Sequence, residues 1–528
     1  MRKCRTVLAS PNWQTDASGK LHLWTMTTDA THLLHILSTG ATPEKLDSLV
    51  GHWALIDERG DDTIIASDRL RSHPLVYSYS QGEWVISDDI ESLRSRVNWS
   101  ADGDQSQIFL HTGFTLGSAT LLQQICSTEA ASLTTLKANG EASTHLYAAY
   151  HYATDSVSNP EEFSSLFSTA LDTCVERMLN FTDDRQLVVP LSGGLDSRLL
   201  VAWLKKFDAP KITTFTYGKA SSPEVAISRK VAEDLDVDWF TVDLDSETIR
   251  TAWNSAEAEE FVRATWKGTS LPHIQDWFPL TVMSKDHLVD DDAVFLPGHT
   301  IVGNMHDEDL LAKQCTEQDV LDALALHHAN LQGKGTKLTR NRTWHREISR
   351  VQREVGYGTT SRTIQEFIEW FNLKHRQAKY INNSVAAYEH YGYSWALPML
   401  DREIWDTWLQ GSQDLTATRQ WYAQFTAQEF EKITGKNVKL FQPSSIRMNS
   451  AIKKPLVRML RLTHVDRLLS RYRSIRTMLD HPMAFEAFAD LPEWKQALQY
   501  VRGVSQMGLW TQAFLTDGWG TEDALVEK

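Results

Sequence analysis

The segment QLVVPLSGGLDSRLLVAWLKKF (186–207) decides the fold predicted for this chain. An apolar run of strand length (186–191) leads into a loop with two adjacent glycines (192–197), and a run with helical spacing of apolar residues (198–207) follows at once. This order is typical of an open α/β sheet, in which ligands bind beyond the carboxyl ends of the strands. The loop is therefore the predicted ligand-binding site.

The residue types of the loop predict that its ligand is an anion. Gly193 and Gly194 let the backbone approach closely, and the free N–H groups of the turn and of the next helix would point at the ligand. Ser192 and Ser197 add hydroxyl donors. Asp196 would repel a phosphate directly, and it fits the site if Mg²⁺ lies between the two charges. The alternative is a simple Gly-Gly turn capped by serine and aspartate.

Strands and helices alternate around this loop, which predicts a parallel sheet covered by helices. A helix is expected to begin near Pro160, with apolar residues at helical spacing over 163–178. Beyond the loop, the expected elements are a strand (211–218), a helix (222–235), a strand (238–244) and a later strand (293–298). From about residue 310 to the end, the pattern is mostly helical.

The N-terminal part reads differently, as short strands separated by turns. The expected strands, rich in β-branched and aromatic residues, are 21–27, 52–58, 63–69, 74–80 and 83–89. Gly60-Asp61-Asp62 and Gln81-Gly82 supply hairpin turns. We therefore predict two domains, a β-rich domain at 1–150 and an α/β domain at 151–528 that is helical from about 310.

Composition excludes several classes of protein. The 528 residues carry a net charge of −15, which argues against a general nucleic-acid-binding protein. No apolar run is long enough to cross a membrane, and no signal-peptide pattern is present at the N-terminus, so we expect a cytosolic protein without membrane partners. The four cysteines lie far apart and predict neither a zinc site nor a disulfide framework.

The loop Ser192–Ser197 matches the SGGxDS motif of the ATP-pyrophosphatase enzymes. The stretches 51–77 with 82–93, 214–235 and 388–405 resemble successive segments of the asparagine synthetase branch of that family. The resemblance implies an α/β protein with an N-terminal β-rich Ntn-type (αββα-like) domain and a PP-loop domain. It implies ATP and Mg²⁺ as cofactors, adenylation of a carboxylate and release of pyrophosphate. A kinase that transfers the γ-phosphate is the poorer interpretation, because the loop has no Walker-type lysine and position 198 is arginine.

The N-terminal domain departs from this family at its expected nucleophile. Active glutaminases of the class place a cysteine directly after the removed methionine, where the thiol and the terminal amine work together. Here Arg2 and Lys3 intervene and Cys4 is displaced. We expect a domain that does not hydrolyse glutamine, so that the nitrogen comes from free ammonia or from an amine.

The resemblance also implies a set of site residues. The expected catalytic residues are Asp196, Glu389 and His299, and the expected metal ligands are Asp196 and Asp307. The expected ATP-binding residues are Leu191, Ser192, Gly193, Gly194, Leu195, Asp196, Ser197, Thr216, Tyr217, Gly218, Gly298 and Thr300.

Two of these assignments, Asp307 and Glu389, compensate for departures from the family. The loop after the strand near 293–296 lacks the family's aspartate, for which Asp307 could substitute, unless it belongs to a solvated helix start. Ser394 and Ala396 stand where the family has glutamate and arginine, so Glu389 or Glu403 would take the role of that glutamate. His273 either faces the ATP site or is a core histidine.

Four functions remain open from the sequence. The first is an AMP-forming amide synthetase that acts on a carboxylate and on ammonia or an amine, with a homodimer left open as its assembly. The second is amidation of a uronic acid in surface-polysaccharide synthesis, since the segment 379–401 resembles proteins associated with that process. The third is a nucleotide-binding homologue without activity that regulates or scaffolds a partner. The last is a binding protein that takes no nucleotide.

Overall fold

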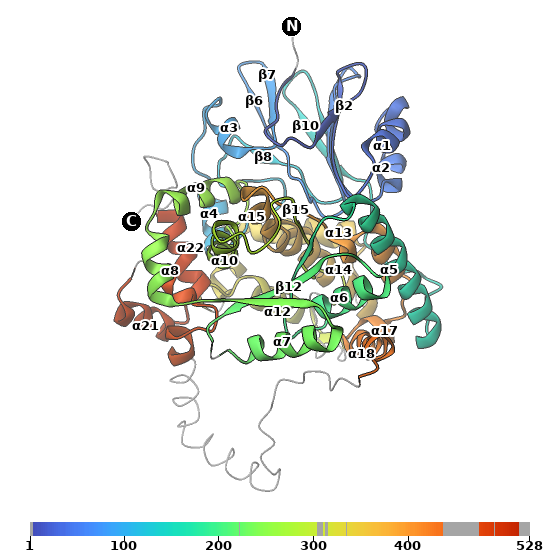
Figure 1. The fold of residues 1–528 in the computed structure, drawn as a ribbon. Helices are drawn as coiled ribbons and strands as arrows, with labels where there is room; N and C mark the ends of the chain where they lie inside the picture. The colour runs from blue at the N-terminus through green and yellow to red at the C-terminus, as the bar shows by residue number, and fades with distance from the viewer. Residues whose placement is uncertain are drawn as a thin grey trace.

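The computed structural model describes residues 4–220, 222–303, 310–311, 315–333, 335–358, 360–436, 475–489 and 491–516 (Figure 1). The predicted metal ligand Asp307 lies outside the described residues. The N-terminal sheets, blue in Figure 1, form one end of the molecule. The parallel sheet of the later residues and the helices around it form the other end. In the described part of the chain, no helix combines the length and the apolar character needed to cross a bilayer.

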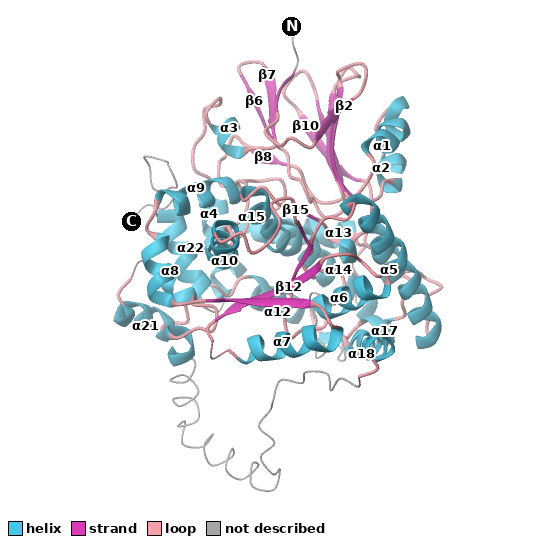
Figure 2. Ribbon diagram, viewed as in Figure 1, coloured by secondary structure: helices cyan, strands magenta, loops and turns pink. Residues whose placement is uncertain are grey.

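The N-terminal part contains two sheets, visible as the upper magenta strands in Figure 2. One sheet has the order β1-β7-β6-β8, and the other has the order β10-β9-β5-β4-β3-β2. The strands are β1 (Cys4–Val7), β2 (Trp13–Thr15), β3 (Leu21–Met26), β4 (His52–Asp57), β5 (Thr63–Ser67), β6 (Val76–Ser80), β7 (Glu83–Ser87), β8 (Cys126–Ser127), β9 (Ser132–Leu136) and β10 (Ala142–Leu146). The helical segments are α1 (Ala30–Ile36), η1 (Leu37–Thr39), α2 (Pro43–Ser48), α3 (Ile90–Arg94) and α4 (Gly103–Thr112).

These sheets bury both of their faces. Trp24, Ile56 and Ile86 belong to a core that continues through the rest of the molecule. Leu23 and Leu33 belong to a separate core between the six-stranded sheet and the layer of α1 and α2. Because α3 packs against β6 and β7 of the other sheet, the layers follow the predicted αββα-like arrangement.

The third sheet, which follows the N-terminal part, is parallel throughout, with the order β13-β12-β11-β14-β15. Its strands are β11 (Leu187–Pro190), β12 (Ile212–Gly218), β13 (Asp238–Asp243), β14 (Val294–Phe295) and β15 (Ser394–Trp395). Helices α5 (Pro160–Thr182), α6 (Asp196–Lys206), α7 (Pro223–Leu235), α8 (Ser246–Trp253), α9 (Ala256–Thr265) and α10 (Ile274–Lys285) connect or cover it. The predicted α/β fold class is confirmed.

The rest of the chain is mostly helical, as predicted. Its described helices are α12 (Glu317–His328), η2 (Gly335–Arg340), α13 (Arg342–Glu354), α14 (Ser361–Phe371), the π-helix η3 (Asn372–Ile381), η4 (Asn382–Ser384), α15 (Val385–His390), η5 (Pro398–Leu400), α16 (Arg402–Trp408), α17 (Gln413–Thr416), α18 (Gln420–Thr434), η6 (Phe485–Phe488), α21 (Glu493–Val501) and α22 (Gln506–Thr516). Helix α18 packs against α6, which starts at the glycine loop. This contact brings a late segment of the sequence to the predicted ligand site.

Candidate functional site

The predicted loop connects β11 to α6 and folds around two serine hydroxyls. The backbone N–H of Ser192 donates to Oγ of Ser197 at 3.1 Å, and that of Gly194 donates to Oγ of Ser192 at 3.2 Å. The two hydroxyl oxygens lie 3.2 Å apart. Leu191 is held in the sheet by its N–H bond to the Phe215 carbonyl at 2.8 Å. The hydroxyls therefore shape the loop in addition to being potential donors to a ligand.

Close packing shows which glycines the loop requires. A Cβ atom on Gly298 would lie 2.7 Å from the backbone nitrogen of Ser197, and one on Gly193 would lie 3.0 Å from the Ile227 side chain. The Cβ of a substituted Gly194, by contrast, would meet only the Ser192 hydroxyl, at 3.1 Å. The segment after β14 is thus pressed against the first residues of α6, where helix N–H groups favour an anion.

Asp196 is the first residue of α6, and Arg419 forms an ion pair with it. Arg419 is the N-cap residue of α18, and the Tyr422 side chain of that helix lies beside both Asp196 and Thr300. Burial raises the pKa of the Asp196 carboxyl, while the neighbouring guanidinium of Arg419 works in the opposite direction. Within the loop 192–197, all of which the structure describes, Asp196 is the residue with a carboxylate. It is therefore the loop residue that could hold Mg²⁺.

Arg198 does not replace the missing lysine of a Walker-type loop. Its side chain is buried, its Nη2 donates to the Gly193 carbonyl at 3.3 Å, and its guanidinium lies 5.7 Å from the centre of the Phe430 ring. Burial lowers the pKa of this arginine. Arg198 therefore supports the glycine loop from the side of α18, where Phe430 lies.

The end of β12 lies beside the loop, as expected for adjacent parallel strands. The Thr216 hydroxyl donates to the Leu191 carbonyl at 2.6 Å, and the Tyr217 hydroxyl donates to Oδ1 of Asp276 at 2.5 Å. Gly218 is followed by a backbone bond from Lys219 to the Pro482 carbonyl at 2.8 Å. These predicted ATP-binding residues frame the loop, but their hydroxyls already have protein partners.

His299 follows Gly298 and lies beside Asn382, His273 and Asp276. Burial, together with the nearby His273, lowers the pKa of His299 to about 4. Its Nδ1 is buried and has no hydrogen-bond partner among the residues that the structure describes. The ring is therefore neutral near pH 7, and burial opposes its protonation.

His273 behaves as a held core histidine, one of the two interpretations left open by the sequence. The side chain is buried, its Nε2 lies 2.6 Å from the Tyr380 carbonyl oxygen, and its Nδ1 lies 2.6 Å from Nε2 of Gln275. Both ring nitrogens thus have protein partners. The ring positions its neighbours, and both of its nitrogens are already engaged.

The structure does not bring Glu389 to the glycine loop. Its Oε1 accepts from Nε1 of Trp395 at 3.0 Å, and its Oε2 lies 3.9 Å from Nζ of Lys267. It precedes β15, which runs parallel to β14 and β11, so it lies toward the amino edge of the sheet, whereas the loop lies at the carboxyl edge. Ser394, at the start of β15, accepts a bond from Nη1 of Arg185 at 3.0 Å.

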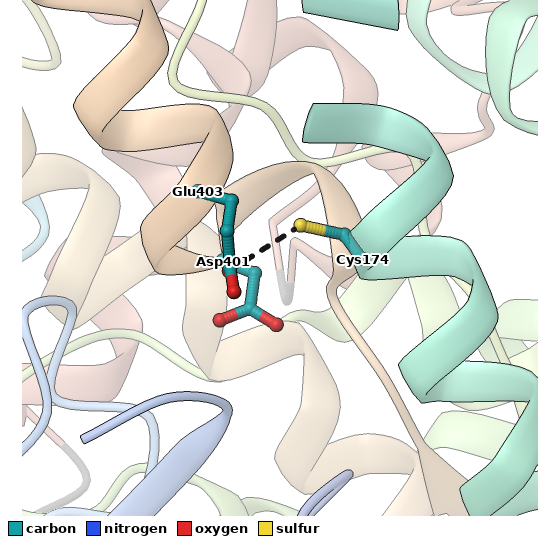
Figure 3. Close-up of side chains that lie close together, drawn as sticks. All are labelled: Cys174, Asp401 and Glu403. Atoms are coloured by element: carbon teal, nitrogen blue, oxygen red, sulfur yellow. Dashed lines mark hydrogen bonds between the residues drawn. The ribbon is translucent and has the colours of Figure 1, made fainter. Parts of the chain in front are cut away.

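The other proposed stand-in, Glu403, belongs to a separate cluster. Cys174, Asp401 and Glu403 lie together where α5 meets the start of α16 (Figure 3). The three side chains are of metal-ligand type, but Arg177 forms ion pairs with both carboxylates, the one to Asp401 at 2.6 Å. Cys174 donates to Glu403 at 3.6 Å. Arg177 therefore balances part of the negative charge of the cluster, and the contacts join two helices.

Cys4 lies in β1 of the N-terminal domain and is buried. Burial, with the nearby Glu58, raises the pKa of its thiol to about 12. A nucleophilic cysteine needs a lowered pKa and access to its substrate. The thiol therefore lacks both properties in this structure.

The local sequence gave no indication of Arg419 or Tyr422. They are separated from the loop by more than two hundred residues and reach it only because α18 packs on α6. A helical pattern for α18 was expected, but its partner helix was not. Pairing between distant helices is the signal that a single sequence does not contain.

Two family models match the chain. The asparagine synthase model matches residues 166–260, and the glutamine amidotransferase domain model matches residues 14–148. The first covers the glycine loop, β12 and β13, and the second covers most of the two N-terminal sheets. A comparison with curated proteins finds no match.

Solved structures show only weak likeness. An NH3-dependent NAD synthetase from Campylobacter jejuni is 13% identical with a TM-score of 0.19, and the match covers 27% of this chain and 61% of that one, less than two thirds of its length. An NAD+ synthetase from Burkholderia pseudomallei is 12% identical with a TM-score of 0.17, over 28% and 67% of the two chains. A predicted subunit of a tRNA methyltransferase from Methanocaldococcus jannaschii is 13% identical with a TM-score of 0.16, over 34% and 91%. We draw no conclusion from likenesses at this level.

The family matches follow the order of the two sheet systems along the chain. The amidotransferase match ends before α5, and the asparagine synthase match begins within α5. Together the two matches support an asparagine synthetase-like family for this chain, with a glutamine amidotransferase domain first and an asparagine synthase domain after it.

Proposed function

We propose that this protein is an ATP-dependent amide synthetase that forms AMP and pyrophosphate and has no glutaminase activity of its own. The asparagine synthase match supports an amide-forming ligase that uses ATP. The observation that carries the proposal is the loop Ser192–Ser197, which stands at the carboxyl end of the central strand β11 and against which Gly298 packs without room for a Cβ. Such a loop is suited to two linked phosphates.

The reaction has two steps. An oxygen of the substrate carboxylate attacks the α-phosphorus of ATP, the bond to the bridging oxygen of the β-phosphate breaks, and pyrophosphate leaves. The lone pair of ammonia or an amine then attacks the acyl carbon, the bond to AMP breaks, and the nitrogen loses a proton. Holding both reactants in place accounts for much of the rate in such a reaction.

The chain's own residues have separate roles in this proposal. The loop N–H groups bind the phosphates, and Asp196 would hold Mg²⁺, which neutralises phosphate charge when bound. Neutral His299 is our candidate for a hydrogen-bond acceptor that orients the attacking nitrogen, because a pKa lowered to about 4 makes its ring a weak base for full proton transfer. Buried Cys4, with its raised pKa, supports an external source of nitrogen.

Pyrophosphate release tests the proposal directly. Release should depend on an added carboxylate and on ammonia or an amine, and Asp196→Ala should reduce it by about a hundredfold or more, the order lost when a charge-stabilising group is removed from a site. Release that is unchanged in this variant would refute the assignment. Release of ammonia from glutamine by the purified protein would refute the missing glutaminase activity.

A sugar carboxylate is our candidate for the acceptor. A cavity of about 700 Å³ lies at the same edge of the sheet, beyond β12 and β13. Its walls include Arg250, Trp253 and Asn254, and also the acids Asp480, Glu486 and Glu493. Arginine can pair with a carboxylate, the indole offers a flat apolar surface, and the amide can bind hydroxyl groups. Pyrophosphate release with glucuronate, compared with release for glucose, tests this choice.

Two observations favour a second candidate, a nucleotide-binding protein without turnover. Asp196 is already paired with Arg419, and Glu389 lies away from the loop. This alternative predicts that ATP raises the melting temperature while no pyrophosphate forms with any acceptor. Turnover with a single acceptor excludes it.

A further inference from the structure

The proposed reaction sets an electrostatic problem that the loop alone does not solve. The triphosphate of ATP brings several negative charges, and Asp196 adds another. The Arg198 side chain, which is nearest in sequence, is buried and bonded to the Gly193 carbonyl. The phosphates therefore require a cation from elsewhere in the fold.

Arg419 is a cation that the structure places on the loop with its side chain partly exposed. Its side chain is 33% exposed and that of Asp196 is 25% exposed, so solvent reaches the pair from one side. The ion pair engages only Nη2 of the guanidinium. Its Nε is buried and has no hydrogen-bond partner in the described part of the chain. A guanidinium has five donor hydrogens, so most of its capacity for an anion is left unused.

Neighbouring groups hold the guanidinium in a defined orientation. It lies 5.2 Å from the centre of the Tyr422 ring, within the range of a cation–π interaction. The Tyr422 hydroxyl stays protonated, because burial raises its pKa well above the ordinary value, and its side chain lies beside Thr300. Arg419 is therefore oriented at the mouth of the loop before any nucleotide arrives.

We propose that Arg419 is a phosphate-binding residue of this loop. In the protein without nucleotide, Asp196 keeps the guanidinium in place. When ATP binds, the guanidinium pairs with oxygens of the pyrophosphate moiety, and Asp196 becomes free to hold Mg²⁺. This inference rests on the proposed function for the identity of the anion. It adds a residue from α18 that neither the loop motif nor the family matches contain.

Two features of this pair are suited to such an exchange. Arginine pairs with phosphate in a bidentate manner, which is stronger and more directional than its contact with one carboxylate oxygen. An ion pair that solvent reaches from one side costs less to break than a fully buried one. The exchange therefore converts a weak contact within the protein into stronger contacts with the substrate.

Calorimetric binding of three ligands tests the proposal without requiring turnover. The ligands are Mg-ATP, inorganic pyrophosphate and adenosine, which has no phosphate. Arg419→Gln should weaken the binding of Mg-ATP and pyrophosphate at least tenfold and leave adenosine unchanged, while Arg419→Lys should recover part of the loss. Arg185→Gln is the matched control, because Arg185 bonds Ser394 at the amino edge of the sheet and should leave all three affinities unchanged.

The outcomes separate this inference from the proposed function. If the wild-type protein binds neither Mg-ATP nor pyrophosphate, the proposed function fails. If it binds both, and Arg419→Gln binds them equally well, only the role of Arg419 is refuted. Equal weakening of all three ligands also refutes it, because that pattern indicates a distorted site. Should Arg419→Gln not fold, Arg419→Lys decides, since wild-type affinity for pyrophosphate in a variant that has lost the bidentate geometry contradicts the proposal.

Discussion

Two arginine–carboxylate clusters in this molecule have similar composition and different completeness. In one, Asp401 is buried and accepts bonds from Arg177 at 2.6 Å, from the N–H of Gly51 at 3.0 Å and from the N–H of Arg402 at 2.8 Å. In the other, Asp196 has a single arginine, and the pair is partly open to solvent. The first cluster is complete within the protein, whereas the second has unused donors.

This difference separates structural acids from acids of a site. Asp401 ties α5 and α16 to the turn before β4, so it joins the N-terminal sheets to the α/β part of the chain. A buried pair of this kind is costly to break because the remaining charge has no water. Asp196 stands at the carboxyl edge of a parallel sheet, where ligands bind. An acid of the site is therefore identified by its incomplete set of hydrogen-bond partners more than by its residue type.

The largest effect on stability is expected when the complete cluster is broken. Arg177→Gln leaves Asp401 and Glu403 without their cation and should lower the free energy of unfolding by about 3 kcal/mol. Arg402→Gln is the control, because its ion pair with Asp406 is about one-third exposed and should matter by under about 1 kcal/mol. Urea denaturation of both variants measures the difference. Equal losses of unfolding free energy in the two variants would show that the complete cluster contributes no more to stability than the exposed pair.

At the open cluster, a backbone change is expected to act on binding. Gly298→Ala places a Cβ 2.7 Å from the backbone of Ser197, which must shift, and should weaken Mg-ATP binding by about tenfold, or about 1.4 kcal/mol. Gly194→Ala meets only a movable hydroxyl and should change binding much less. Titration calorimetry compares the two. A stronger loss for Gly194→Ala would show that the packing of the 297–303 segment does not shape the site.

Protonation of His299 provides a third test, with a defined sign. The pKa of His299 is lowered from an ordinary value near 6.5 to about 4 in the folded protein. Between pH 6.5 and pH 4, the unfolded chain therefore binds a proton at this residue that the folded protein does not bind. Stability from this group is present above pH 6.5 and is lost as the pH falls toward 4. His299→Gln should flatten that part of the curve by up to about 1.4 kcal/mol per pH unit. Unfolding free energies at pH 7, 6 and 5 check this, and parallel curves would contradict it.

The sequence predicted those parts of the fold that depend on local pattern. The loop 192–197 and the strands around it were recognisable because apolar runs of strand length lead directly into glycine and cap residues. The predicted strand at 74–80 begins two residues later, at Val76. The helix predicted to begin near Pro160 does begin there, and it extends to Thr182, beyond the apolar pattern at 163–178. Such shifts arise because cap and partner contacts set the ends of elements.

Other features could not be read from local pattern. Strand β1 (Cys4–Val7) and the two-residue strand β15 exist because neighbouring strands pair with them. Helices α1 and α2 cover a sheet whose outer face was not foreseen. Arg419 reaches Asp196 through helix packing, and Glu389, chosen as a stand-in by its proximity in sequence, points to Trp395 instead. In each case, contacts between segments that are distant in the sequence set the position of the element or side chain.

The smallest effect is expected at Cys4, which extends the comparison to the N-terminal domain. Its thiol is enclosed like the acids of the complete cluster, with burial raising its pKa to about 12, so it stays protonated and unreactive near pH 8. Cys4→Ala should leave pyrophosphate release unchanged and cost only about 1 kcal/mol of stability, as for a small buried apolar group. Iodoacetamide labelling of the native protein, read by mass spectrometry, should spare Cys4 and reach it only in urea. Rapid labelling of Cys4 in the folded protein, or loss of activity in Cys4→Ala, would show a reactive thiol and reopen the question of a glutaminase in this domain.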